Sequence, residues 1–171
     1  SGLRELKSST AALVRHMDRL DALLQKHLRS SMKSVGWWPD VQRCRAIEGV
    51  GPVTAMALTL IFHRGQFTSS DAFIAFLGMD VRVRESGKFV GRRKLTKKGD
   101  PELRRLLYMA AMTACRSMAW KPFYERALAR GLSRIQALVA LGRKLARIGY
   151  ALLKNQSTYR PKITQETCVA T

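Results

Sequence analysis

An apolar stripe along the first part of the chain limits its possible folds more than any other feature. From Leu3 to Met32 the apolar residues recur three, four and seven positions apart, which is the spacing of one face of a long helix. Basic side chains keep the other faces polar, so the stripe is narrow and needs a second helix to cover it. We predict that residues 1–35 form a coiled-coil helix, with Ser1 and Gly2 as the remnant of a tag. The sequence leaves open whether this helix pairs within the chain or across a dimer.

A series of helix boundaries follows and predicts an all-α domain over residues 36–160. Pro39 disfavours helix at Trp38, and Asp40 is a candidate cap for the next helix. Apolar periodicity places Met118 and Ile135 on inward faces of later helices. The chain is expected to fray after Asn155, and residues 161–171 to form a polar tail. The expected helices are 41–47, 52–62, one ending at 77, one opening at 100–101, 123–129, and one capped by Ser133.

The chain is strongly basic, which indicates a polyanionic partner. Its 31 Lys and Arg residues oppose 12 Asp and Glu residues, for a formal net charge of +19. Such a charge opposes folding by self-repulsion and attracts polyanions, so nucleic acid is the leading partner and a membrane surface is the alternative. No apolar run is long enough to span a bilayer, so no membrane partner is expected.

Residues 47–57 carry a pattern that suits the binding of DNA phosphates. Their sequence, I-E-G-V-G-P-V-T-A-M-A, places Gly-Val-Gly between two predicted helices, as in a helix-hairpin-helix motif. Gly49 and Gly51 permit positive φ and a close approach of the backbone to a phosphate. An ordinary tight connection between helices is the alternative. The candidate DNA-binding donors are backbone N–H groups at the start of the second helix, where Pro52 has none: Gly51, Val53 and Thr54.

Residues 78–99 form a glycine-rich basic loop in which a loose hairpin is expected. Residues typical of strands, such as Val81 and Phe89, alternate there with charged ones. This interleaving favours phosphate binding over a merely solvated surface. The candidate DNA-binding cations are Arg82, Arg92, Arg93, Lys94, Lys97, Lys98, Arg104 and Arg105.

Ser86 is the hydroxyl-bearing residue at the centre of this loop. A serine that attacks a phosphodiester needs exposure, a proton acceptor and cations that stabilise the pentavalent phosphorus. Arg84 and Lys88 are the candidate catalytic cations, and the role of Glu85 is left open. On residue chemistry alone, a serine before a glycine is far more often a turn residue than a nucleophile.

Other catalytic and metal-binding patterns are not found in the sequence. His16, His27 and His63 are scattered, and His63 is expected to pair with the last carbonyls of its helix. The cysteines lack metal-ligand spacing and are expected to be reduced. Asp71 and Asp100 stand at helix starts, where capping explains them. No metal ligand is assigned in this chain, and a complete two-metal nuclease is not expected.

Five segments carry a family resemblance through their order and spacing. They are R-A-I-E-G-V-G-P-V-T-A, F-x-S-x-x-A-F-x-A-F-L-G-M, the S-G-K loop, L-T-K-K-G-D-P-E-L-R-R-L-L, and A-L-V-A-L-G-R-K-L-A-R-I-G-Y-A-L-L. From about Val41 to Lys162, the chain resembles the C-terminal half of the DEDD-type insertion-sequence transposases. That group includes bridge-RNA-guided recombinases and pilin-gene invertases.

The resemblance implies a fragment of a longer recombinase. In the family, a ribonuclease-H-like domain with four acidic metal ligands precedes a coiled coil and this domain. Mg²⁺ is therefore expected in that N-terminal domain, and no cofactor in this chain. The family nucleophile is a serine in a Ser-Ser-Gly-Gly-Lys loop, which implies this role for Ser86, with Glu85 and Lys88 replacing the first serine and the second glycine.

The same resemblance predicts the partners. It implies double-stranded DNA, leaves a structured guide RNA open, and predicts a homo-oligomer, a dimer or a dimer of dimers, through the N-terminal helix. It also implies a cytoplasmic, nucleoid-associated protein of a bacterium or an archaeon. Two alternatives stand beside it: a non-catalytic helix-hairpin-helix module for DNA or RNA, and a coiled-coil assembly domain whose charge only aids solubility.

Overall fold

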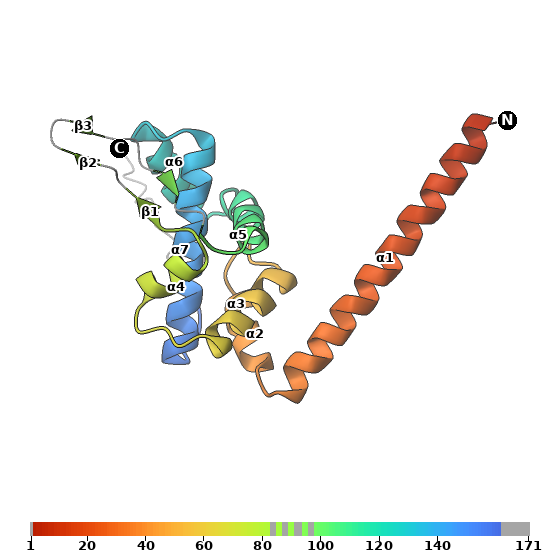
Figure 1. Ribbon diagram of the computed structural model, residues 1–171, viewed down its shortest axis with the longest axis horizontal. Coiled ribbons are helices and arrows are strands. Elements are labelled where there is room, and N and C mark those ends of the chain that lie inside the picture. Colours follow the sequence, from red (N-terminus) through yellow and green to blue (C-terminus); the bar gives the residue numbers. More distant parts are fainter. Residues whose placement is uncertain (1, 83–84, 87–88, 91–93, 96–97, 162–171) are drawn as a thin grey trace, which may run out of the picture. The chain divides into compact units, whose positions relative to one another are not determined.

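The computed structural model describes residues 2–82, 85–86, 89–90, 94–95 and 98–161 (Figure 1). At residues 82, 85–86, 89–90 and 94 it describes the backbone. The chain divides into two compact units, Ser1–Trp38 and Pro39–Thr171, and each is considered by itself.

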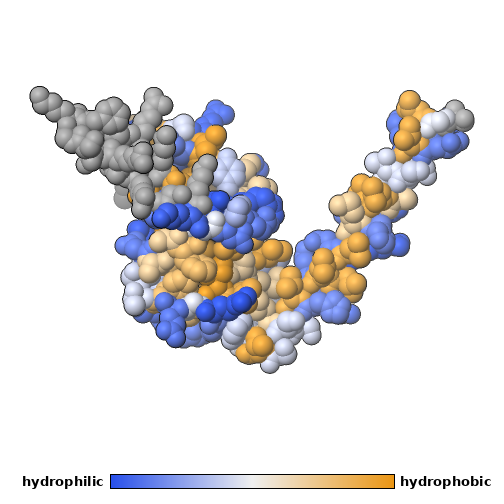
Figure 2. All heavy atoms as spheres, in the orientation of Figure 1, coloured by the Kyte–Doolittle hydropathy of each residue, from blue (hydrophilic) through white to orange (hydrophobic). Residues whose placement is uncertain are grey.

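The first unit is one long helix, α1 (Gly2–Ser34), which confirms the helix expected there. Of its described side chains only Met32 is buried. The apolar stripe is solvent-exposed, from Leu3 at 71% to Leu28 at 44%, and Figure 2 shows apolar side chains in orange between polar ones in blue. After the helix, Gly36 has a φ of +77°, and the Trp37 N–H donates to the Met32 carbonyl at 2.9 Å. A stripe exposed over this length is typical of a helix that binds a partner.

The second unit is helical and is built around its last helix, which confirms the all-α fold class. α7 packs against α3, α4, α5 and α6 (Figure 1). Two glycines of α7 make these contacts close. A Cβ on Gly142 would lie 3.1 Å from the Leu107 carbonyl oxygen, and a Cβ on Gly149 would lie 3.3 Å from Leu58 Cδ1. The helices are α2 (Trp38–Arg45), α3 (Pro52–Arg64), α4 (Ser70–Phe76), α5 (Pro101–Ala114), α6 (Lys121–Ala129) and α7 (Arg134–Asn155).

The core of this unit lies between α7 and the helices that cover it. Leu141, Leu145 and Leu153 of α7 are fully buried, as are Leu107 of α5 and Phe73 of α4. Burial of one such side chain contributes about 1.5–3 kcal/mol. This apolar core stabilises a unit whose net charge opposes folding.

Side-chain caps confirm most of the predicted helix starts. Ser69 accepts from the Ala72 N–H at 3.1 Å, and Asp100 accepts from the Glu102 N–H at 2.8 Å. Ser133 forms a capping box with Gln136 at the start of α7. These bonds satisfy backbone donors that the first turn of a helix leaves without partners.

The segment between α4 and α5 contains four two-residue strands, which we call the ribbon. β1 (Val81–Arg82) pairs antiparallel with β4 (Lys94–Leu95), and β2 (Glu85–Ser86) pairs antiparallel with β3 (Phe89–Val90). The expected hairpin is therefore confirmed.

Predictions at the boundaries of some elements were wrong. α2 begins at Trp38, and Pro39 fits in its first turn because no N–H is needed there. Asp40 is a buried residue of that helix. Met118 is 79% exposed because α5 ends at Ala114 and its periodicity stops there. Ile135 is 65% exposed because it lies in the first turn of α7, before the buried stretch of that helix begins.

The chain after α7 does not fray where expected. Gln156 ends the helix in the left-handed conformation, with φ of 51° and ψ of 33°. The Ser157 N–H then donates to the Leu152 carbonyl at 3.2 Å, and the Tyr159 hydroxyl donates to Glu48 Oε2 at 2.5 Å. The chain therefore continues as part of the packed unit at least to Tyr159. The predicted polar tail lies outside the described residues from position 162 onward.

Candidate nucleic-acid interface

The turn between α2 and α3 packs against α5. Gly49 has a φ of +86°, and a Cβ there would lie 2.5 Å from the Ala110 carbonyl oxygen and 2.6 Å from Ala114 Cβ. Both the conformation and the space therefore exclude a side chain. The Val50 N–H donates to the Ile47 carbonyl at 3.0 Å within the turn. Gly49 thus shapes the turn by packing against α5.

The start of α3 lies on the accessible side of this turn. Gly51 is the N-cap without a side-chain acceptor, and a Cβ on it would meet nothing within 4 Å. The Ala55 N–H donates to the Gly51 carbonyl at 2.9 Å, so the N–H groups of Val53 and Thr54 precede the first bond of the helix. Val53 is 37% exposed, whereas the Thr54 side chain is buried. A helix start of this kind attracts an anion.

Two glycines bring the ends of the ribbon together. A Cβ on Gly78, where φ is +67°, would lie 2.4 Å from the Gly99 nitrogen, and a Cβ on Gly99 would lie 2.5 Å from the Gly78 nitrogen. Arg104 Nη1 donates to the Gly99 carbonyl oxygen at 2.5 Å. The predicted cation Arg104 therefore also holds the base of the ribbon, next to the start of α5.

The strand pairing places Ser86 at the outer end of the ribbon. Ser86 pairs with Phe89 and is the last paired residue before the hairpin connection. Nearer the base, Arg82 pairs with Lys94. The remaining predicted ribbon residues lie outside the described residues: Arg84, Lys88, Arg92, Arg93 and Lys97.

The predicted cations that follow the ribbon differ in their surroundings. Lys98 is exposed. Arg105 is exposed and makes a bidentate pair with Glu102, with Nε to Oε2 at 2.8 Å and Nη2 to Oε1 at 2.5 Å. These hydrogen bonds raise the pKa of Arg105 and lower the pKa of Glu102. An exposed ion pair of this kind contributes little to stability, and a phosphate can compete for the guanidinium.

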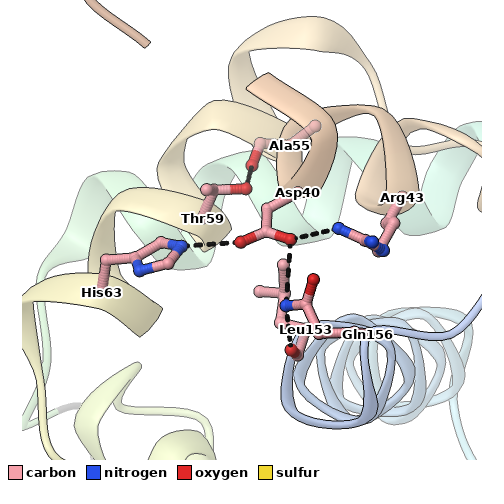
Figure 3. A network of polar contacts seen from close by, with 7 residues as sticks. All are labelled: Asp40, Arg43, Ala55, Thr59, His63, Leu153 and Gln156. Carbon is pink, nitrogen blue, oxygen red and sulfur yellow. Dashed lines mark hydrogen bonds and ion pairs between the residues drawn. The ribbon is translucent and has the colours of Figure 1, made fainter. Parts of the chain in front are cut away.

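A buried carboxylate joins α2, α3 and the end of α7, and sequence analysis did not predict it (Figure 3). Asp40 Oδ1 accepts from Arg43 Nη1 at 2.5 Å and from Gln156 Nε2 at 3.2 Å. Asp40 Oδ2 lies 2.7 Å from His63 Nε2. The Asp40 side chain is 9% exposed, and these partners offset the cost of removing the carboxylate from water. The spacing of Asp40 and Arg43 was visible in the sequence, but the pairing with His63, expected to act at the end of its own helix, was not.

Glu48, the neighbour of Gly49, makes a second contact that sequence analysis missed. Its Oε2 accepts from Trp120 Nε1 at 3.2 Å and from the Tyr159 hydroxyl at 2.5 Å. Burial raises the pKa of Tyr159, and the hydrogen bond to Glu48 raises it further, so the phenol remains a donor. The turn is thus connected to the start of α6 and to the chain after α7.

The described residues contain no cluster of three or more His, Cys, Asp or Glu side chains that could hold a metal ion. Cys44 is buried, and burial raises the pKa of its thiol to about 12. A thiol in that state is neutral and a poor nucleophile. Nor does the described part of the chain include a helix with the length and apolarity needed to cross a membrane.

The glycine turn and the ribbon lie within a stretch that matches a family model. Residues 41–125, which include both the glycine turn and the ribbon, match the family model described as Transposase IS116/IS110/IS902 family. This stretch of the chain is therefore similar to the domain that the transposase family model describes.

Several curated proteins are similar to the chain in sequence. The chain is 33% identical to a probable family 20 transposase of Pseudomonas aeruginosa over 164 residues, which cover 93% of this chain and 46% of that protein. It is 36% identical to the transposase for insertion sequence element IS1111A of Coxiella burnetii over 131 residues, covering 71% and 35%. It is 27% identical to the pilin gene-inverting protein of Moraxella lacunata over 121 residues, covering 68% and 38%. The chain thus spans about half the length, or less, of these relatives.

Proposed function

We propose that this chain is the DNA-binding C-terminal domain of a transposase or site-specific recombinase. One observation carries the proposal: the stretch matched by the transposase family joins an accessible helix start at residues 51–54 to a basic ribbon. The names of the relatives, transposases and a pilin gene-inverting protein, support DNA as the substrate.

On this proposal, the turn acts as a helix-hairpin-helix phosphate-binding site. The backbone N–H groups of Gly51, Val53 and Thr54 donate to a phosphate, while Gly49 keeps the turn close to α5. Such contacts position DNA without distinguishing its sequence. The exposure of Val53 and the open space around Gly51 support this role.

The ribbon and the residues after it supply further phosphate contacts. Each cation that neutralises a phosphate releases a counterion, so binding weakens as salt rises. The proposed contacts are Arg82, Arg92, Arg93, Lys94, Lys97, Lys98, Arg104 and Arg105.

We infer that Ser86 is the nucleophile of strand cleavage. The bond from Ser86 Oγ to the scissile phosphorus forms as the bond from phosphorus to the leaving deoxyribose oxygen breaks. The serine proton passes to a base, and the leaving oxygen takes up a proton. Arg84 and Lys88 stabilise the negative charge on the phosphoryl oxygens. The place of Ser86 at the outer end of the β2–β3 pair supports this role.

The Mg²⁺ expected for this reaction belongs, on this proposal, to an N-terminal domain of a longer protein. The described residues of this chain do not fit the ion, because their carboxylates do not cluster with other ligands. Asp40, Glu48 and Asp71 are instead engaged by neighbouring donors within the fold. No step is therefore assigned to the ion here.

We further propose that α1 joins copies of the protein into a dimer or a dimer of dimers. Its exposed stripe supports this, since an uncovered apolar face of a long helix favours association. Double-stranded DNA is the proposed partner of the second unit, with a structured guide RNA as a further one. The proposed location is the bacterial or archaeal cytoplasm, on the nucleoid.

A second candidate function is a non-catalytic helix-hairpin-helix module for DNA or RNA. One observation favours it: the second unit alone supplies both the backbone donors at the start of α3 and the packing of Gly49 against α5. In that case the ribbon holds the backbone, and Ser86 is only a turn residue.

Duplex binding tests the proposed function. We expect affinity for a labelled DNA duplex to fall with salt, with a slope of about −0.9 for each phosphate contacted. Gly51→Asp puts a carboxylate at the helix start, where it caps α3 but occupies the phosphate position, so stability is kept and affinity falls. Gln66→Asp makes the same charge change at an exposed site between α3 and α4. An affinity that does not change with salt would contradict the proposed function. Equal losses of affinity in the two variants would contradict the role of the turn.

A further inference from the structure

A groove lies within the second unit, between α6, α7 and the chain after α7. Its volume is about 610 Å³. This is within the range of roughly 300–1,000 Å³ typical of small-ligand sites. Phe123 and Arg126 come from α6, Lys144 and Ile148 come from α7, and residues 158–160 form the third side.

The third side of the groove is a fixed part of the fold. The left-handed Gln156 turns the chain at the end of α7, and its side chain donates to Asp40 and to the Leu153 carbonyl (Figure 3). Further along, the hydrogen bond from Tyr159 to Glu48 ties the segment to the glycine turn. Contacts within the chain itself therefore hold the third side of the groove.

The groove combines cations with an aromatic ring. Three of its lining residues, Arg126, Lys144 and Arg160, are basic. The described lining includes no Asp or Glu side chain. Glu48, the acid that Trp120 and Tyr159 bind behind the lining, has its Oε2 occupied by those two donors. Phe123 is half-buried and packs edge-on to Trp120, with ring centroids 6.5 Å apart.

This combination matches one class of ligand. Proteins that bind single-stranded nucleic acid pair basic side chains for the backbone with aromatic rings on which bases stack. A base inside a duplex is not available to enter a cavity, because it is paired and stacked on both faces.

We propose that this groove binds an unpaired nucleotide of a single-stranded nucleic acid, with its phosphates at Arg126, Lys144 and Arg160 and its base against Phe123. The inference rests on the proposed function in taking nucleic acid as the partner. It adds a site that is separate from the turn and the ribbon and that selects unpaired strands.

Paired affinity measurements test the charge of the groove. The probes are a labelled oligothymidylate and a labelled duplex, each titrated with the whole chain. The double variant Arg126→Gln/Lys144→Gln should bind oligothymidylate at least tenfold more weakly, with a salt slope less negative by about 1.4, from roughly 0.7 for each phosphate contact. The matched control Arg130→Gln/Arg134→Gln removes the same charge from exposed positions outside the groove. Equal losses in the two double variants would overturn the proposal.

Photochemical crosslinking tests the place of the base. An oligothymidylate with one 5-iodouracil should crosslink to the peptide that contains Phe123 or Tyr159. Phe123→Leu keeps an apolar side chain but removes the ring, so its crosslink should be lost, while its thermal midpoint shows whether the fold survives. Crosslinks confined to other peptides would overturn the proposal.

The two probes separate failure of this inference from failure of the proposed function. If duplex binding depends on salt but the groove variants bind single strands normally, the proposed function is supported and the groove proposal is contradicted. If the unmodified chain binds neither the duplex nor oligothymidylate, both the groove proposal and the proposed function are contradicted.

Discussion

The glycine turn between α2 and α3 and the ribbon between α4 and α5 use glycine for different reasons. In the turn, Gly49 fits the backbone against α5, while Gly51 leaves the start of α3 accessible. In the ribbon, Gly78 and Gly99 face each other and close the base, where Arg104 holds the carbonyl of Gly99. The turn is thus part of the core, whereas the ribbon joins the core at its base. We therefore expect substitutions in the turn to lower the free energy of unfolding more than substitutions in the ribbon.

The largest effect should come from a methyl group inside the turn. Gly49→Ala places a Cβ 2.5 Å from the Ala110 carbonyl oxygen at a φ of +86°, so both overpacking and backbone strain act. We expect the free energy of unfolding in urea to fall by about 3 kcal/mol. Gly51→Ala, whose Cβ meets nothing within 4 Å, is the matched control and should lower it by no more than about 1 kcal/mol, because alanine caps a helix less well than glycine. Similar losses in the two variants would contradict the division of roles.

A smaller effect is expected at the base of the ribbon. Gly99→Ala places a Cβ 2.5 Å from the Gly78 nitrogen and 2.5 Å from the Phe76 carbonyl oxygen. The contact is with backbone, but no left-handed strain is added, so we expect a loss of about 2 kcal/mol in unfolding free energy. Duplex binding through the turn should persist in the folded variant. A loss larger than that of Gly49→Ala would show that the ribbon base is the more constrained region.

The connection between the turn and the chain after α7 should depend on pH. The folded state raises the pKa of Tyr159 above the ordinary value of 10.0 and holds the phenol proton more tightly than the unfolded chain does. The resulting stability is fully present below about pH 10 and is lost as pH rises above it. For one proton the slope cannot exceed about 1.4 kcal/mol per pH unit, and solvent screening of this partly exposed group shortens the pH range over which it applies. Tyr159→Phe should remove this slope, and unfolding curves of both proteins above pH 10 check it.

The smallest effect on stability is expected at Arg105. Its pair with Glu102 is exposed, so Arg105→Gln should leave the thermal midpoint unchanged. If Arg105 contacts a phosphate, the salt slope of duplex binding should become less negative by about 0.9. Arg116→Gln, at an exposed site outside the proposed contacts, is the control. If the salt slope of duplex binding is unchanged in both variants, Arg105 does not contact a phosphate.

Helices and caps could be predicted from the sequence because their signals are local. The stripe of α1, the cap of α5 at Asp100 and the capping box at Ser133 each depend on residues within one or two turns. The strand-type residues of the ribbon likewise predicted a hairpin. The predictions for Met118 and Ile135 were wrong because α5 ends before Met118 and because Ile135 lies in the first turn of α7, before its buried stretch.

The candidate site was only partly predictable. Its glycines and cations are visible as a pattern, but the difference between Gly49 and Gly51 depends on α5, which is distant in the sequence. The contacts of Asp40 with His63, and of Glu48 with Tyr159, also join residues far apart in the chain. Only tertiary packing brings such pairs together, so periodicity and spacing do not predict them.

Covalent capture tests the central claim most directly. A longer protein that carries this domain together with the proposed N-terminal domain is incubated with Mg²⁺ and a nicked target duplex, then denatured and separated on a gel. We predict a protein–DNA adduct that is absent in Ser86→Ala and present in the matched variant Ser157→Ala, whose serine is exposed in the chain after α7. Strand transfer that persists in Ser86→Ala without any adduct would contradict the nucleophile and leave this chain as a DNA-binding module.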